Sequence, residues 1–354
     1  MVPHTSARPG HRATSDRVGL GVVGRQGRVT MAALLVLWSA TLAWALTFLA
    51  DPHKLVQVRN GLVATSAPES EFRWVPDNRP ADFRQEGGTV PPAIQAGIRA
   101  ALPDQQTMLG TWDKALALAR HLSAGKRVIG GAIQSDTVSA YLAIRQTGGG
   151  YCADYTQVMN GLAHAAGISI RKWGMSFGNF SGDGHAFSEV YDSERGKWVF
   201  FDPFYSFYVA NANTGEPLSV LEFVEALRGG AGVEALAVQA VDPEAFSFPS
   251  PRAALEYYRR GADRVFLGMG NDVFTYDSHP AVRWASTFGR KVEQVAGLLV
   301  GAAPGILILE TETNGDSIRA LRLSVGGFLA ASVLWVIATV GLAVGIARRV
   351  RQRL

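Results

Sequence analysis

Cysteine and charge are the two things that this sequence has little of. The chain of 354 residues contains one cysteine, so an intramolecular disulfide and a cysteine-based zinc cluster are both excluded. Charged residues make up 18% of the chain, against about 25% in a typical soluble domain, while apolar residues reach 47%. This composition excludes an intrinsically disordered chain and points toward a membrane.

Two sequence motifs are also missing, one for binding a metal and one for binding a phosphate. No histidines are spaced as H-x-x-x-H, and the glycines at 148–150 are not followed by the Lys-Ser/Thr of a phosphate-binding loop. We therefore expect no cofactor and no metal.

Residues 1–30 and 348–354 each carry a net charge of +4 within a total of +4, which leaves −4 for the body of the chain. A mildly acidic body argues against nucleic-acid binding.

Uncharged runs near both ends predict two transmembrane helices. Residues 31–50 and 323–347 each reach the roughly 20 apolar residues that a helix needs to cross a bilayer. The first run also fits a signal peptide cleaved at Ala43-Trp44-Ala45, but its length and its long basic lead favour an uncleaved anchor. Because arginines flank the outer end of each run, we expect both termini in the cytoplasm. The residues between the spans would then face the periplasm of a bacterial inner membrane.

Composition divides the chain into seven segments. Residues 51–90 are rich in Pro, Asp, Glu and Arg and predict an extended stalk or cap. The apolar stretch 295–309 is broken by Pro304 and Gly305 and is short for a third span, so we expect a core, interfacial or re-entrant segment. The segments are a basic cytoplasmic segment (1–30), a span (31–50), the stalk or cap (51–90), a central domain (91–210), a C-terminal extension (211–322), a span (323–347) and a basic cytoplasmic tail (348–354).

Hydrophobic periodicity between the spans predicts helices followed by an antiparallel meander. Apolar residues recur at helical spacing in the earlier part, and they alternate with polar residues in the later part. This order is typical of an α+β fold. The predicted helices cover 91–102, 109–122, 137–145, 153–166, 219–227 and 252–260, and the predicted strands cover 168–177, 184–191 and 197–202, with a hairpin turn at 192–196.

The single cysteine lies where a thiol becomes reactive. Cys152 follows the glycine run at the start of a predicted helix, where unpaired amides and the positive end of the helix dipole favour the thiolate. Taken alone, a buried and inert cysteine is the commoner outcome. However, His185 opens one predicted strand and Asp202 ends its hairpin partner, so the turn brings these two residues to one end of the hairpin. His185 can then act as base toward Cys152 while Asp202 orients the imidazole.

These residues lie in sequence boxes that resemble the transglutaminase-like superfamily, which also contains related bacterial cysteine proteases. The boxes are G-Y-C-A-D-Y at 150–155, G-H-A-F-S-E-V at 184–190 and W-V-F-F-D-P at 198–203, with a G-I-x-x-R strand between the first two. The resemblance covers about residues 109–208, and it departs from the family at Phe187, where tryptophan is common. It implies a Cys152–His185–Asp202 triad and a papain-like core, in which a helical part carries the nucleophile against an antiparallel sheet.

Three more residues are candidates for supporting roles. The backbone amide of Cys152 is one donor for an oxyanion. Gln146, six residues earlier at a papain-like offset, is either a second donor or, as is commoner, an exposed residue at a helix end. Tyr151 either lines the acyl pocket or packs in the core. Glu189 shares a strand face with His185, either as a hydrogen-bond partner or as a solvated charge.

The sequence therefore predicts a membrane-anchored cysteine hydrolase or acyltransferase that acts on a peptide or protein amide in the periplasm. The alternative is a catalytically inactive transglutaminase-like module of an envelope or polysaccharide assembly system. The expected partners are a protein or peptide substrate, the membrane and envelope-assembly proteins, with no nucleic acid.

Overall fold

The structure is a computed structural model that describes residues 17–103, 109–124, 131–229 and 233–352. The chain forms two compact units. One unit consists of Met1–Pro52 together with Val325–Leu354, and the other consists of His53–Ser324. We call them the helical unit and the sheet unit, and we describe each by itself.

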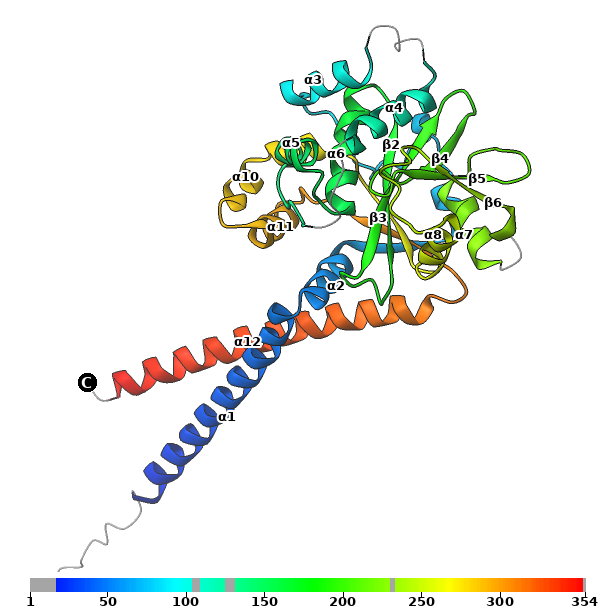
Figure 1. The fold of residues 1–354 in the computed structure, drawn as a ribbon. Helices are drawn as coiled ribbons and strands as arrows, with labels where there is room; N and C mark the ends of the chain where they lie inside the picture. Colours follow the sequence, from blue (N-terminus) through cyan, green and yellow to red (C-terminus); the bar gives the residue numbers. More distant parts are fainter. Residues whose placement is uncertain (1–16, 104–108, 125–130, 230–232, 353–354) are drawn as a thin grey trace, which may run out of the picture. The chain divides into compact units, whose positions relative to one another are not determined.

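Two long helices make up the described part of the helical unit (Figure 1). They are α1 (Arg17–Ala50) and the part of α12 (Gly315–Arg351) that lies beyond Ser324. The indole Nε1 of Trp38 donates a hydrogen bond of 3.0 Å to Thr339 Oγ1, and the rings of Trp38 and Trp335 lie 6.3 Å apart. The two helices therefore pack against each other through an aromatic contact and an interhelical hydrogen bond.

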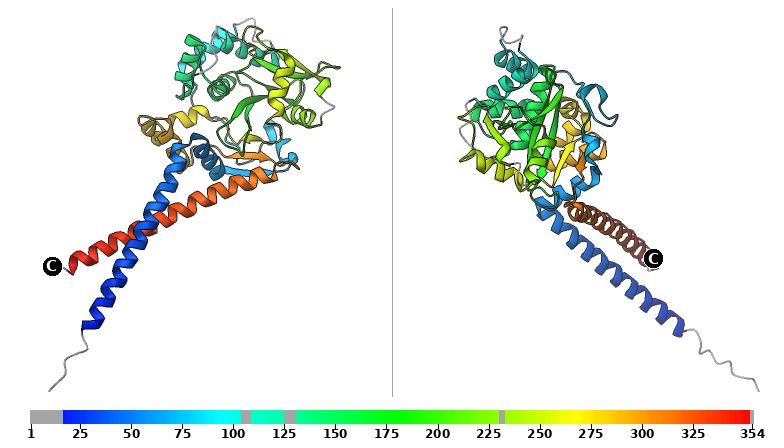
Figure 2. Two further views of the ribbon diagram at one scale, coloured as in Figure 1. Left: turned by 60° about the horizontal axis from the view of Figure 1, so that its bottom comes forward. Right: turned by 90° about the vertical axis from the view of Figure 1, so that its right-hand side faces the viewer.

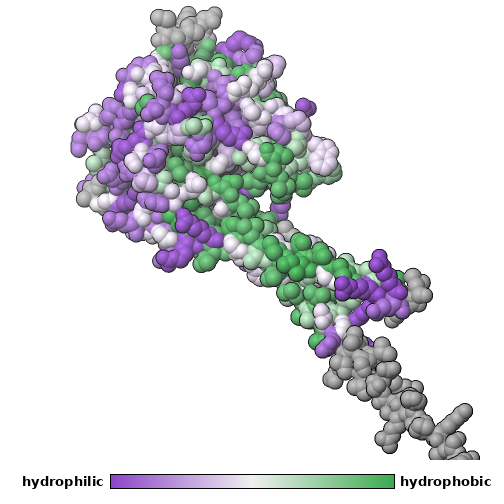
Figure 3. Space-filling view, turned by 180° about the vertical axis from the view of Figure 1, so that it is seen from behind, coloured by the Kyte–Doolittle hydropathy of each residue, from purple (hydrophilic) through white to green (hydrophobic). Residues whose placement is uncertain are grey.

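The surface of both helices suits a bilayer. Gln26–Phe48 and Gly315–Arg351 are long and apolar enough to cross a membrane, and few of their side chains are buried in the protein. Figure 3 shows hydrophobic surface along these helices. The predicted spans 31–50 and 323–347 fall within or close to these two segments, so the structure supports membrane anchoring without fixing the orientation.

The sheet unit is built on a six-stranded mixed sheet in the order β1-β8-β7-β2-β3-β4 (Figure 1). The first pair, β1 and β8, is parallel, and every other pair is antiparallel. A mixed helix and sheet architecture of this kind agrees with the predicted α+β class. The strands are β1 (Ala64–Ala67), β2 (Ile170–Ser176), β3 (Gly184–Asp192), β4 (Lys197–Phe201), β7 (Val265–Gly268) and β8 (Ile306–Leu309), and a separate hairpin pairs β5 (Phe207–Asn211) with β6 (Leu236–Ala240).

Helices lie on either side of the strands (Figure 2). On one face, Ile170 and Val190 pack with α4 and α6; on the other, Trp173 and Phe187 pack with α7 and α8. Because successive side chains of a strand point to opposite faces, β2 and β3 supply both cores at once. The helices of the unit are α2 (Pro52–Val63, of which Pro52 belongs to the helical unit), α3 (Pro92–Ala101), α4 (Thr111–Ser123), α5 (Thr137–Thr147), α6 (Cys152–Ala165), α7 (Val220–Arg228), α8 (Pro251–Arg259), α9 (Val273–Ser278), α10 (Pro280–Ser286) and α11 (Arg290–Leu299).

The helices and strands predicted for the central domain are confirmed to within a few residues. The boundaries predicted at residues 90 and 210, in contrast, do not delimit separate units. The segment 51–90 provides α2 and the edge strand β1, so it is not only a stalk or cap, and the segment 211–322 provides two strands of the same sheet. The apolar stretch 295–309 contains the end of α11 and strand β8.

A buried ion pair ties the sheet to the elements around it. Arg171 Nε lies 2.7 Å from Glu189 Oε2, and both side chains are almost completely buried. The indole of Trp173 donates to the same carboxylate, Val220 donates its N–H to it, and Arg171 donates to the carbonyl of Phe72. Since these charges have several hydrogen-bond partners as well as each other, the pair is tolerated in the interior.

We expect the change Arg171→Met to lower the free energy of unfolding by about 3–5 kcal/mol, because it leaves the Glu189 carboxylate buried without its cation. Denaturant unfolding of the full chain in a neutral detergent measures this loss. The matched control is Arg252→Met, whose ion pair with Glu256 is exposed and should contribute at most about 1 kcal/mol. Equal losses in the two variants would contradict the structural role of the buried pair.

Candidate active site

Local backbone geometry places Cys152 at the first position of α6. Gly148 and Gly150 have φ values of +66° and +106°, which glycine adopts readily, and they turn the chain into the helix. Asp154 Oδ2 accepts a hydrogen bond of 2.8 Å from the N–H of Tyr151, which closes the N-terminal cap. The N–H of Cys152 is therefore among those that the helix geometry leaves without an intrahelical acceptor, and the thiol lies at the positive end of the helix dipole.

His185 and Asp202 meet at one end of the β3–β4 hairpin. His185 is the second residue of β3, and Asp202 directly follows β4. The Nε2 atom of His185 lies 2.7 Å from Asp202 Oδ2, and both side chains are buried. Because Nε2 faces the carboxylate, Nδ1 is the ring nitrogen left for the thiol.

Four hydrogen bonds hold the carboxylate of Asp202. Its Oδ1 accepts from the N–H groups of Phe204 at 2.8 Å and Tyr205 at 3.0 Å, and its Oδ2 accepts from the hydroxyl of Tyr258 on α8 as well as from His185. Burial raises the pKa of Asp202, but the charge of His185 and these donors outweigh burial, so the pKa is lowered. Asp202 is thus held as a carboxylate in a fixed orientation.

The charges of the site favour a thiolate next to an imidazolium. Burial raises the pKa of the Cys152 thiol, but the positive charge of His185 and a hydrogen bond from it outweigh burial, and the pKa falls below its ordinary value. For His185, burial lowers the pKa, while the charges of Asp202 and Cys152 raise it to about 10. Both shifts favour a thiolate beside an imidazolium over two neutral groups.

Aromatic rings enclose His185. Their centroids lie between 5.0 and 6.2 Å from the imidazole centroid. Such a wall keeps water away from the ring, which strengthens its interaction with the two anions. The rings belong to Phe187, Phe204, Tyr205, Tyr257 and Tyr258. Neither Tyr257 nor Tyr258 was identified from the sequence, where they appear only as two residues of an amphipathic helix.

The three supporting candidates have different surroundings. Gln146 is exposed on the last turn of α5, and Tyr151 is 49% exposed at the N-cap of α6, so their suggested roles stay predictions. Glu189 lies on the same face of β3 as His185, but its hydrogen bonds go to Arg171, Trp173 and Val220 instead. Glu189 therefore stabilises the fold and is not the partner of the imidazole.

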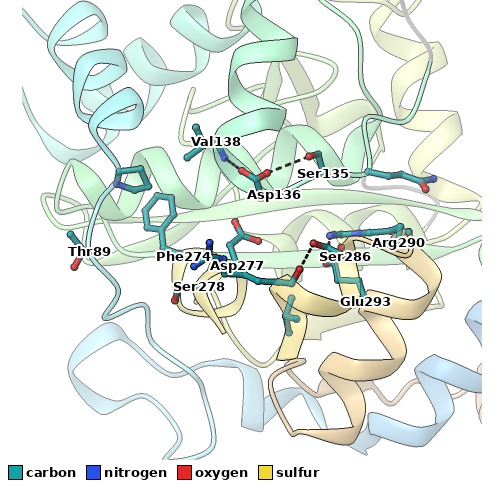
Figure 4. Close-up of a pocket in the computed structure, with 15 residues that line it drawn as sticks. Thr89, Ser135, Asp136, Val138, Phe274, Asp277, Ser278, Ser286, Arg290 and Glu293 are labelled. Carbon is teal, nitrogen blue, oxygen red and sulfur yellow. Dashed lines mark hydrogen bonds and ion pairs between the residues drawn. The ribbon is translucent and has the colours of Figure 1, made fainter. Parts of the chain in front are cut away.

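A cavity of about 710 Å³ lies between α5, α9, α10 and α11 (Figure 4). The side chains around it include Asp136, Asp277, Arg290 and Glu293, and none of Cys152, His185 and Asp202 lines it. Within the described ranges of the chain, no group of three or more His, Cys, Asp or Glu side chains is arranged to hold a metal ion.

A helix-borne cysteine beside a histidine–carboxylate pair on an antiparallel hairpin is the arrangement that a cysteine nucleophile requires. Residues 103–203 match the family model of the transglutaminase-like superfamily, so the chain contains a transglutaminase-like domain. The matched range includes Cys152, His185 and Asp202, whereas α7–α11, β7 and β8 lie outside it. Comparison with curated proteins and with solved structures finds no match.

Alkylation by iodoacetamide reports on the thiol directly, because Cys152 is the only cysteine. In the unmodified protein, the lowered pKa raises the thiolate fraction at a given pH above that of an ordinary thiol, so alkylation should begin at a lower pH. In His185→Ala, burial is left as the main influence, so the pKa of the thiol rises. We expect alkylation at pH 7 to slow at least tenfold, since one pKa unit changes the thiolate fraction about tenfold, and to recover at alkaline pH.

The control for this experiment is His164→Ala. His164 lies near the other end of α6, beside Phe274, and its loss should leave the pH profile of alkylation unchanged. A profile for His185→Ala that matched both this control and the unmodified protein would show that the imidazole does not act on the thiol.

Proposed function

We propose that this protein is a membrane-anchored cysteine hydrolase or acyltransferase that acts on a peptide or protein amide through Cys152, His185 and Asp202. The observation that carries the proposal is the 2.7 Å contact between His185 and Asp202 beside a thiol whose pKa is lowered. The packing of α6 against the antiparallel strands β2 and β3 supports a papain-like arrangement of the core.

In the first half of the reaction, the Cys152 thiolate attacks the amide carbonyl carbon, and a bond forms between sulfur and carbon. The carbonyl electron pair moves onto oxygen, where the N–H of Cys152 is placed to stabilise the negative charge. When the carbonyl re-forms, the carbon–nitrogen bond breaks, and the His185 imidazolium gives its proton to the departing amine. The product of this half is a thioester on Cys152 and a neutral imidazole.

In the second half, water or an amine attacks the thioester carbonyl. His185 takes the proton of the attacking group, and the carbon–sulfur bond breaks as the carbonyl re-forms. This step restores the thiolate and the imidazolium with which the cycle began. Asp202 keeps its charge throughout, because its role is to orient the imidazole and to stabilise the cation.

We further propose that the sheet unit lies on the periplasmic side of a bacterial inner membrane. Arginines precede the first apolar run, and four more follow the last one, and positively charged flanks stay in the cytoplasm. Two spans then return both termini to the cytoplasmic side.

The nucleophile is tested with p-nitrophenyl acetate on the full chain in neutral detergent. We expect a burst of about one equivalent of nitrophenolate and one acetyl group on Cys152 by mass spectrometry, both absent in Cys152→Ala. Asp202→Asn should slow acylation at least about tenfold, because the imidazolium loses its counter-charge, whereas His164→Ala should acylate normally. A wild-type thiol that iodoacetamide alkylates but no acyl donor modifies would contradict the enzyme and favour the inactive binding module.

A further inference from the structure

A second cavity, of about 260 Å³, is lined by residues of α2, α6, β2, β7 and α11 and by none of the proposed catalytic residues. Its polar lining includes the cations Arg59, Lys172 and Arg290 and the amide of Asn160. The remaining wall is largely apolar and includes Val63, Phe266, Leu298, Pro304 and Ile306. All of these residues belong to the sheet unit.

Two of the cations form no ion pair with a residue that the structure describes. The guanidinium of Arg59 donates to the amide oxygens of Asn60 at 2.9 Å and Gln294 at 3.1 Å, which are neutral groups. The ammonium of Lys172 makes no hydrogen bond or ion pair with a residue that the structure describes. Burial lowers the pKa of Lys172 and the charge of Arg59 lowers it further, while the charges of Cys152 and Asp154 act in the opposite direction. Holding two partly buried cations close together is unfavourable unless an anion joins them.

The acidic residues of the cavity are engaged elsewhere. Asp272 pairs at 2.5 Å with Arg84, and Asp277 Oδ2 accepts from the N–H of Thr137 at 2.7 Å. Burial also raises the pKa of Asp277 to about 6. Neither carboxylate therefore neutralises Arg59 or Lys172.

An unsatisfied polar group accompanies the cations. Asn160 is only 2% exposed, and its Oδ1 has no hydrogen-bond partner among the described residues. A buried amide without a partner costs free energy, and by rotating it can offer a ligand either its oxygen or its NH₂ group. Asn160 and the two cations, Arg59 and Lys172, line the same cavity.

We propose that this cavity binds a phosphate or carboxylate group between Lys172 and Arg59, with Asn160 completing the hydrogen bonding. A volume of about 260 Å³ accommodates such a group, since one water molecule in the liquid occupies about 30 Å³. The anion is either free in solution or the head group of a lipid whose chains follow the apolar wall.

Thermal unfolding of the full chain in neutral detergent tests the site with two probes, inorganic phosphate and dihexanoyl phosphatidylglycerol. At least one probe should raise the unfolding temperature of the wild type at micromolar to millimolar concentration. Lys172→Met should weaken that binding at least tenfold, and Lys172→Arg should retain most of it. The matched control Arg99→Met changes an exposed cation on α3 outside the cavity and should bind as the wild type does.

The two probes separate the sources of the anion. Similar affinities indicate a free anion, and a lipid affinity more than tenfold higher indicates a head group. Wild-type protein that neither probe stabilises, or equal stabilisation of wild type and Lys172→Met, would overturn the proposal. A cooperative thermal transition in the absence of either probe verifies that each variant is folded.

A second inference comes from a different feature, an exposed apolar face on α10 and α11. Trp284 is 67% exposed and Leu299 is 82% exposed, and Phe288 and Val295 are more than half exposed. The rings of Trp284 and Phe288 lie 5.1 Å apart. Figure 3 shows hydrophobic surface on the side of the sheet unit where α10 and α11 lie. Contiguous apolar surface of this kind marks an interaction site.

A short stretch of chain, helix α2, connects the first span to this face. Pro52 begins α2 two residues after α1 ends, and Arg59 on α2 hydrogen-bonds to Gln294 on α11. Seven helical residues of chain, a rise of about 10 Å, thus separate the start of α2 from the residue that contacts α11. Exposed Arg283 and Lys291 flank the apolar face, and basic residues beside tryptophan are typical of segments that lie in a membrane interface.

We infer that the apolar face of α10 and α11 rests in the surface of the lipid bilayer. In the Cys152→Ala background, Leu299→Cys provides one site for an environment-sensitive fluorophore. In vesicles of phosphatidylcholine and phosphatidylglycerol, its emission should shift to the blue and be quenched by lipid-borne nitroxides. The control is Gln95→Cys on α3, which is exposed but outside the face.

Quenching at position 299 no stronger than at position 95 would refute the inference. A blue shift that persists without lipid quenching, together with crosslinking of two copies through position 299, would also refute it by showing that a second copy covers the face.

Discussion

The hydrogen-bonded carboxylate of Asp202 is the interaction on which the proposed chemistry depends. It receives donors from β3, from the turn after β4 and from α8, so three elements that are separate in the chain fix one side chain. Without that anion, burial would favour a neutral imidazole, and a neutral imidazole would no longer lower the pKa of Cys152. Tyr258, which donates one of these hydrogen bonds, lies on the opposite face of the sheet from Cys152 and outside the range matched by the family model.

Charged side chains on β2 and β3 occur in two contrasting states. Arg171 and Glu189 face each other and use neighbouring backbone and indole groups to complete their hydrogen bonding, so their burial is compensated within the protein. Lys172, the next residue of β2, points to the other face and has no such partner among the described residues. Because adjacent strand residues face opposite sides, one strand can carry a structural charge and an uncompensated one side by side. Arg171 therefore stabilises the fold, whereas Lys172 is available to bind the anion proposed above.

The sequence predicted those parts whose signals are local. The glycine run and Asp154 marked the start of α6, and the polar turn between two alternating runs marked the β3–β4 hairpin, which together located Cys152, His185 and Asp202. Strands β1, β7 and β8 have four residues each, too few to show periodicity, and they pair across long stretches of chain. Tyr258 could not be found for a similar reason, because no spacing rule links it to Asp202. The role of Glu189 was ambiguous in the sequence, because strand periodicity predicts the face of the sheet on which a side chain lies but not the residue that it contacts.

The topology of the sheet unit explains how one unit can be attached to two spans. Because β1 and β8 are parallel, the chain enters β1 and leaves β8 at opposite ends of the pair. The first turns of α12 bring the chain back toward α2. Ile318 and Leu321 pack with Phe180 and Ile308. Ser324 then donates a hydrogen bond to Gln57 on α2. Both connections therefore leave the unit at adjacent points, which is what a unit anchored on one side of a bilayer by two helices requires.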